Sequence, residues 1–172
     1  TNTSQAVKLF DIILEESNLT GNEIVYDLFC GTGSISLYIS KFAKMVYGFE
    51  LVASAVQDAM QNAIHNNVKN AWFLKGNLEN LFRENSEAKE LESPDIIIID
   101  PPRAGLHSKT VQDIINKSPD RIIYVSCNPA TQARDVALLC QEEYILKKLR
   151  PVDMFPHTPH IENIATLAKK KA

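Results

Sequence analysis

The segment "YVSCNPATQARD" places a cysteine where an apolar run ends and the chain turns. Asn128 and Pro129 follow Cys127 and predict a sharp turn, with a helix that starts at once. A thiol close to a helix N-terminus is favoured in its nucleophilic, thiolate form. Cys127 could instead be a small core residue at a strand end, but its surroundings favour a nucleophile.

A proton acceptor that could work with this cysteine stands in "MFPHTPHIENI". Glu162 begins the last apolar run, which we expect to reverse direction, bringing Glu162 to the edge of the sheet where Cys127 lies. The alternative interpretation is a surface glutamate at the start of a strand. His157 and His160 are weaker candidates, because each could equally shape the connection by hydrogen bonding.

A cofactor-binding edge is predicted by "VYDLFCGTGSISL", where Gly31 and Gly33 separate an apolar run from a helical segment. Such a turn lets a ligand approach backbone N–H groups at a helix N-terminus, although a plain tight turn would look the same. Glu50 ends the next apolar run, where its carboxylate could bind ribose hydroxyls or simply favour the start of the following helix. These residues fit a dinucleotide and S-adenosylmethionine equally well.

The segment "DPPRAG" favours the second cofactor. Asp100 ends a strongly apolar run, and two prolines stiffen the loop that follows it beside the cofactor. A methyltransferase can use such a loop to hold the methionine end of the cofactor or the target base, whereas a dehydrogenase has no evident need for it. Asn77, in "KGNLEN", is placed to meet the adenine, and a helix N-cap is an equally good interpretation.

A cysteine, a methyl donor and a base together suit methylation at C5 of a pyrimidine. C5 is a poor nucleophile until a thiolate adds at C6 and turns the ring into an enolate, which can take the methyl group. A base must then remove the C5 proton so that the thiol can leave. We therefore predict Cys127 as the nucleophile and Glu162 as the base.

The elements that would position these residues alternate between apolar runs and segments of helical period, which predicts a mostly parallel sheet covered by helices on both faces. Strands are predicted at 23–29, 45–50, 71–76, 95–100, 121–127, 144–153 and 162–170. Helices are predicted near 4–17, 34–43, 52–67, 108–117 and 130–142.

Two features of the pattern predict the sheet's arrangement. The four isoleucines of "DIIIID" must be buried on both faces, so this strand is central. The connection between the last two strands is too short for a crossover helix, so they should pair antiparallel and the final strand should run against the others. The charged segment 83–94 is predicted to be a surface loop or an irregular helix.

The composition predicts one soluble domain, because 172 residues with 45% hydrophobic content can build a sizeable core. No apolar run approaches membrane-spanning length. Three cysteines without a CxxC pair argue against a disulfide framework and against a metal or iron–sulfur site, and they suit a reducing cytoplasm. Cys30 is best explained as a small residue in the glycine turn and Cys140 as a buried helix position.

The charge of the chain offers no general attraction for nucleic acid, since the formal net charge is −3. An RNA partner would have to be bound by a local patch or by a missing segment. Candidate patch residues are Lys147, Lys148, Arg150 and the lysines at 169–171, although an ordinary solvated surface explains each of them as well.

The segments "DLFCGTGSISL", "FE", "DPPRAG", "RIIYVSCNPATQARD" and "PVDMFPHTPHIEN" together resemble the catalytic domain of the RNA uracil-5 methyltransferases over essentially the whole chain. The resemblance implies a Rossmann-like class I S-adenosylmethionine-dependent fold in one domain, residues 1–172. It also implies that the enzyme makes 5-methyluridine in RNA, with Cys127 attacking C6 of the target uridine and Glu162 removing the C5 proton. Cofactor contacts are implied at Phe29, Glu50, Asn77 and Asp100.

The family also sets expectations for the RNA partner and for the rest of the protein. "DPPRAG" and "SCNPAT" resemble the 23S ribosomal RNA branch slightly more, with transfer RNA as the nearest alternative substrate. Many members carry an N-terminal RNA-binding barrel, which this chain lacks, so we expect a piece of a longer, monomeric protein. Ser34 stands where some members have Asn, which removes the expectation of a contact from this side chain.

Three other functions fit fewer residues. A cytosine-5 RNA methyltransferase would have another cysteine in the loop where this chain reads "DPPRAG". A nicotinamide dehydrogenase would need a third glycine or alanine where Ser36 stands, and it leaves Cys127 and Glu162 without a task. A non-enzymatic cofactor-binding or RNA-scaffolding module would bind its ligand without forming a covalent intermediate.

Overall fold

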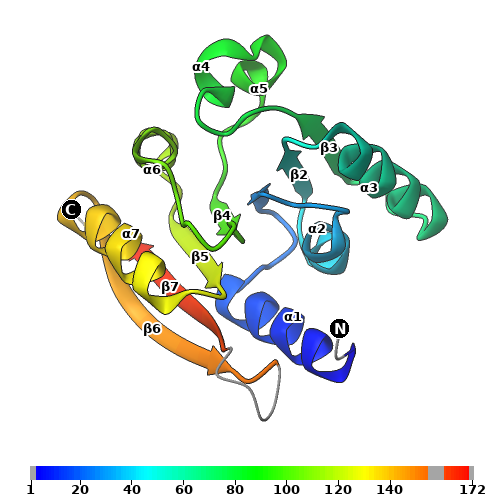
Figure 1. The fold of residues 1–172 in the computed structure, drawn as a ribbon. Coiled ribbons are helices and arrows are strands. Elements are labelled where there is room, and N and C mark those ends of the chain that lie inside the picture. Colours follow the sequence, from blue (N-terminus) through cyan, green and yellow to red (C-terminus); the bar gives the residue numbers. More distant parts are fainter. Residues whose placement is uncertain (1–2, 155–160, 171–172) are drawn as a thin grey trace.

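The computed structural model describes residues 3–154 and 161–170, so the candidates His157 and His160 lie outside the described residues. One seven-stranded sheet has the order β3-β2-β1-β4-β5-β7-β6 (Figure 1). Each strand matches its predicted range to within one residue at either end. The strands are β1 (Ile24–Leu28), β2 (Met45–Glu50), β3 (Ala71–Lys75), β4 (Ile96–Ile99), β5 (Arg121–Ser126), β6 (Tyr144–Val152) and β7 (Glu162–Lys169).

The strand directions confirm the prediction of a mostly parallel sheet with a reversed final strand. Strands β1 to β5 pair parallel with one another. Strand β7 lies between β5 and β6 and pairs antiparallel with both. The first residues of β7 therefore lie at the edge of the sheet where β1 to β5 end, and this is the edge at which the candidate site residues gather.

Helices cover both faces of the sheet, as predicted (Figure 1). The predicted helix 34–43 divides into α2 and the 3-10 helix η1, and the charged segment 83–94 contributes to two short helices. The bounds are α1 (Thr3–Ser17), α2 (Ser34–Ile39), η1 (Ser40–Phe42), α3 (Ala53–His65), α4 (Leu81–Glu84), α5 (Ser86–Glu90), α6 (Ser108–Lys117) and α7 (Pro129–Gln141).

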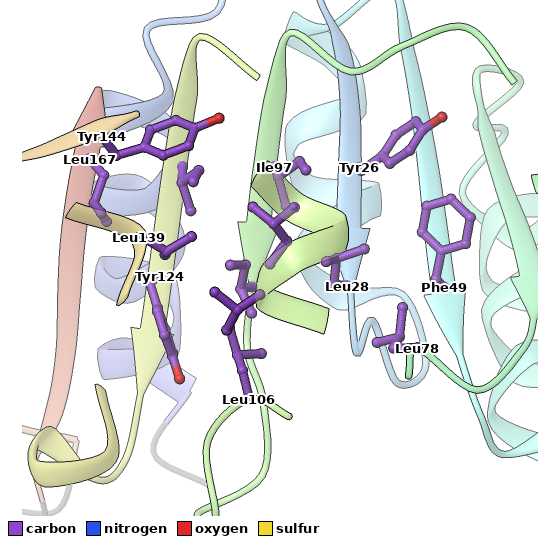
Figure 2. Packing of buried hydrophobic residues seen from close by; sticks show 14 of the residues in the cluster. Tyr26, Leu28, Phe49, Leu78, Ile97, Leu106, Tyr124, Leu139, Tyr144 and Leu167 are labelled. Carbon is purple, nitrogen blue, oxygen red and sulfur yellow. The ribbon is translucent and has the colours of Figure 1, made fainter. Parts of the chain in front are cut away.

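The isoleucines of β4 lie at the centre of the core, because β4 is the middle strand and neighbouring side chains point to opposite faces. Ile97 and Ile99 pack on the face covered by α4 to α7, whereas Ile96 and Ile98 pack with α1 and α2. Figure 2 shows Ile97 between Tyr26 of β1 and Tyr124 of β5. Each buried isoleucine contributes about 1.5–3 kcal/mol, so this strand fixes the position of both layers.

Helix α1 is attached to the β6–β7 hairpin by a carboxylate that is only 7% exposed. Glu16 accepts hydrogen bonds from Lys148 (2.6 Å), Arg150 (2.9 Å) and Thr166 (3.1 Å). Burial alone would raise the pKa of Glu16, but these hydrogen bonds hold it below its usual value. Lys148 and Arg150, which the sequence offered as RNA contacts, are therefore committed to the fold.

The turn between β1 and α2 depends on left-handed backbone at both of its glycines. Gly31 has φ 54° and Gly33 has φ 82°. A Cβ atom added to Gly33 would lie 2.8 Å from the Phe73 ring and 3.1 Å from Ala59, whereas one added to Gly31 would meet nothing within 4 Å. Gly33 is thus required by packing, and Gly31 leaves open space beside the turn.

We expect Gly33→Ala to lower the free energy of unfolding by about 2–4 kcal/mol, because it adds a steric clash to the cost of a left-handed alanine. Gly31→Ala should cost only the left-handed conformation, about 1–2 kcal/mol. Urea unfolding of both variants measures the difference. Equal losses at the two positions would show that the close approach to Phe73 does not matter.

Candidate functional site

A cavity of about 720 Å³ lies at the carboxyl ends of β1 to β4. Four of the residues predicted to bind a cofactor line it: Phe29 after β1, Glu50 at the end of β2, Asn77 after β3 and Asp100 after β4. The other two, Gly31 and Gly33, are not part of its lining. Parallel strands bring their carboxyl ends to one edge, which is why residues so far apart in sequence meet here. The rest of the lining comes from Leu51, Val52, Leu78, Glu79, Pro102, Ala104, Gly105, Leu106, His107, Thr110 and Arg134.

Glu50 is held at the cavity by two backbone N–H groups. Its Oε2 atom accepts a hydrogen bond from Gly31 N at 3.1 Å, and its Oε1 atom accepts one from Val52 N at 2.9 Å. Val52 is the N-cap residue of α3, so Glu50 does stabilise the start of that helix. A carboxylate has about four lone-pair sites, so two remain for hydroxyl groups of a ligand.

Asn77 is exposed in the cavity wall and does not cap a helix. Its Oδ1 atom accepts a hydrogen bond from Glu79 N, two residues further along the chain, at 3.0 Å, which forms an Asx turn. The N-cap residue of α4 is Asn80, so the capping alternative for Asn77 is wrong. The side-chain NH₂ group of Asn77 has no partner among the described residues and can face a ligand.

Cys127 is half-buried at the bend between β5 and α7. The prediction placed it at the end of the strand, but β5 ends at Ser126, because the Ser126 hydroxyl accepts a hydrogen bond from Asn128 N at 3.0 Å and turns the chain. Asn128 is the N-cap of α7 and accepts a hydrogen bond from Ala130 N at 3.2 Å. The thiol is therefore carried on a bend that is anchored on both sides.

Glu162 is half-buried at the first position of β7. In the antiparallel ladder between β5 and β7, Ser126 pairs with Asn163. Cys127 follows Ser126 and Glu162 precedes Asn163, so both residues lie just beyond this last pair, at the end of the ladder where β5 stops. The fold thus carries the residues predicted as nucleophile and base to the same end of the β5–β7 pair, and neither lines the 720 Å³ cavity itself.

Asp100 lines the cavity and also acts electrostatically on Glu162. Burial raises the pKa of Glu162 to about 7, and the negative charge of Asp100 adds to this effect. Desolvation by the surrounding protein also raises the pKa of Asp100 to about 6, although the residue is exposed to solvent at the cavity. Both acids are therefore poised to exchange protons near neutral pH.

Asp27 is a buried acid of the site region that the sequence reasoning did not single out. It lies within β1, is fully buried, and accepts a hydrogen bond from the Ser36 hydroxyl. Its Oδ1 atom has no hydrogen-bond partner among the described residues. Burial raises its pKa to about 7, with a further contribution from Asp100. The sequence does contain a signal for this residue, because Asp27 is an acidic residue within the otherwise apolar run "IVYDL".

The loop after β4 is held by polar side chains of α7, another feature that the sequence reasoning missed. The Arg103 carbonyl accepts hydrogen bonds from Asn128 at 3.0 Å and Thr131 at 3.2 Å. Asp135 accepts a hydrogen bond from Leu106 N at 2.7 Å. The helix that begins beside Cys127 therefore also fixes the loop that begins at Asp100.

Two classes of site receive no support within residues 3–154 and 161–170. No group of three or more His, Cys, Asp or Glu residues there could hold a metal ion. No helix in this part of the chain is long and apolar enough to cross a bilayer. Cys30 is buried in the core, and burial strongly raises the pKa of its thiol, so it has no role as a nucleophile.

Comparison with known proteins places this arrangement in a family. The family model described as tRNA (Uracil-5-)-methyltransferase matches residues 1–170. A relative from Bacteroides thetaiotaomicron, described as an uncharacterized RNA methyltransferase, is 48% identical over 167 residues, covering 97% of this chain and 36% of the relative. The chain thus spans little more than a third of the length of such relatives.

Solved structures agree with this assignment. A tRNA (uracil-54, C5)-methyltransferase from Pyrococcus abyssi is 38% identical with a TM-score of 0.82, and the match covers 98% of this chain and 39% of that one. A precorrin-6y C5,15-methyltransferase from Geobacter metallireducens has a TM-score of 0.76 over 94% of this chain and 88% of that one, but at 14% identity it shows the Rossmann-like methyltransferase fold alone. The chain belongs to the tRNA (uracil-5-)-methyltransferase family.

Proposed function

We propose that the protein transfers a methyl group from S-adenosylmethionine to C5 of a uridine in RNA, with Cys127 as nucleophile and Glu162 as base. The observation that carries the proposal is the antiparallel pairing of Ser126 with Asn163, because Cys127 and Glu162 are the next residues at that end of the ladder. Family membership supports the same activity. A cytosine-5 methyltransferase is not favoured, because the loop after Asp100 contains no second cysteine.

The residues of the cavity fit S-adenosylmethionine. The Pyrococcus relative was solved in complex with S-adenosyl-L-homocysteine, the form that remains after methyl transfer. In this chain, the lone pairs that Glu50 keeps free suit the ribose hydroxyls, and the NH₂ group of Asn77 suits the adenine. The cavity volume lies within the usual range for such ligands, about 300–1,000 Å³. When bound, the cofactor supplies an electrophilic methyl group.

The chain's own residues would complete the reaction in two steps. The Cys127 thiolate forms a bond to C6 of the uracil, which gives C5 the electron density to take the methyl group. Glu162 then accepts the C5 proton, the C5–C6 double bond reforms, and the C6–sulfur bond breaks with return of its electrons to the thiolate. A carboxylate with a pKa of about 7 suits the second step, because a general base works best with a pKa near the working pH.

Two classes of RNA are candidate substrates. The segments "DPPRAG" and "SCNPAT" favour 23S ribosomal RNA, whereas the matched family and the Pyrococcus relative carry transfer RNA in their names. We propose ribosomal RNA as the first candidate and transfer RNA as the alternative. Mapping which 5-methyluridine disappears when the gene is deleted decides between them.

Cys127 can be tested by trapping with RNA that carries 5-fluorouridine, whose fluorine cannot be removed as a proton. The complete polypeptide with S-adenosylmethionine should form a stable protein–RNA adduct, visible as a shifted band on a denaturing gel. Cys127→Ala should abolish the adduct, whereas the matched control Cys140→Ala should keep it. An equal adduct yield from Cys127→Ala would remove Cys127 from the mechanism, and binding without any adduct would favour a non-enzymatic module.

The proposed base predicts a pH dependence. Because the pKa of Glu162 is raised to about 7, its carboxyl is protonated and inactive as a base below that pH and is ionised above it. Decay of the covalent adduct on ordinary uridine RNA should slow about tenfold for each pH unit below 7 and level off above it. Single-turnover measurements from pH 5.5 to 8.5 test this. Glu162→Gln should accumulate adduct at every pH, and normal turnover by this variant would exclude Glu162 as the base.

The cofactor site predicts a loss of affinity on removal of the Glu50 carboxylate. Glu50→Ala should weaken S-adenosylmethionine binding by about 1.5–3 kcal/mol, roughly 10- to 100-fold, because hydrogen bonds to a charged acceptor are lost. Isothermal titration calorimetry measures this, with exposed Glu87→Ala on α5 as the matched control. Unchanged affinity in Glu50→Ala would place the cofactor elsewhere.

A further inference from the structure

Gln132, in the first turns of α7, is an amide buried against the sheet at 2% exposure. Its Nε2 atom donates hydrogen bonds to the Tyr124 carbonyl (2.7 Å) and the Asn163 carbonyl (2.9 Å). Its Oε1 atom accepts a hydrogen bond from Asn163 Nδ2 at 2.5 Å. Both N–H groups and the oxygen of this side chain are thus satisfied within the protein, and all by β5 and β7.

An apolar side chain would fill this position more simply, as Val136 and Leu139 do further along the same helix. A buried amide gains little net stability over apolar packing, because its hydrogen bonds mainly repay its desolvation. Unlike an apolar side chain, the Gln132 amide forms hydrogen bonds that require a fixed geometry. Its three hydrogen bonds fix the distance between Tyr124 of β5 and Asn163 of β7.

Asn163 directly follows Glu162, at a position where the β6–β7 ladder lacks a backbone donor. Its register partner in β6 is Pro151, which has no N–H group to donate to the ladder. On the other side, Asn163 pairs with Ser126, the last residue of β5. The start of β7 therefore depends on the side chain of Gln132 as well as on the backbone ladder.

We propose that Gln132 is a positioning residue that acts through Asn163 to hold Glu162 in place at the start of β7, at the end of the sheet where Cys127 lies. This inference rests on the proposed function. Cys127 is anchored separately, through Ser126 and Asn128, so loss of the Gln132 amide should disturb the base and spare the nucleophile. A purely structural role for Gln132 would instead affect both steps in proportion.

The test separates the two steps in the complete polypeptide with the Gln132→Met variant, which keeps a similar length and removes the amide. The rate of adduct formation on 5-fluorouridine RNA should stay within about twofold of the parent. Adduct decay on ordinary uridine RNA should slow about 10- to 100-fold, as expected for a misplaced catalytic group, so that the steady-state adduct fraction rises. The matched control is Gln112→Met, at an exposed position of α6, which should change neither rate.

Asn163→Ala removes the other half of the pair and gives a second, independent variant if Gln132→Met does not fold, which thermal unfolding reveals. It should show the same slow decay with normal adduct formation. The double variant should decay no more slowly than the slower single variant, because residues that act as one unit are not additive.

Each outcome decides a different claim. Slow decay with normal adduct formation supports the positioning role. Equal slowing of both steps, or no slowing of either, overturns that role while leaving the proposed function in place. If the parent protein forms no adduct on 5-fluorouridine RNA, the proposed function fails and the positioning role fails with it.

Discussion

The reversed direction of β7 is the constraint on which the site depends. Because β7 runs antiparallel between β5 and β6, its first residue lies at the edge where β5 ends. A parallel β7 of the same length would carry Glu162 to the opposite edge of the sheet, roughly 25 Å away at about 3.3 Å per residue. The direction of β7 thus brings the proposed base to the end of the sheet where the proposed nucleophile lies.

The electrostatic character of the site follows from the same crowding at one edge. Asp27 lies in β1, Asp100 directly follows β4 and Glu162 begins β7, and desolvation raises the pKa of each of them. Asp100 also disfavours ionisation of the other two, so its own protonation state affects the pKa of both Asp27 and Glu162. The charge of Asp100, which lines the cavity, therefore affects the protonation of the proposed base Glu162.

Much of this arrangement follows from the sequence, because apolar runs and turn residues report strand order directly. "DIIIID" identified the central strand, and the short connection before Glu162 identified the reversed one. The sequence could not say which face of a helix a polar residue occupies, so Gln132 went unnoticed although its hydrogen bonds join β5 to β7. The sequence also could not show which charged residues pair with each other. Lys148 was a candidate RNA contact, but in the structure it forms an ion pair with Glu16.

The attachment of α1 to the hairpin has a consequence for the order of folding. Glu16 meets Arg150 across 134 residues of sequence and Thr166 across 150. Contacts of such high sequence separation form late, because the intervening chain must first be ordered. During synthesis the Glu16 carboxylate of α1 cannot meet these partners until nearly the last strand of this chain has emerged. The earliest segment of this chain to be made is thus among the last to reach its final place.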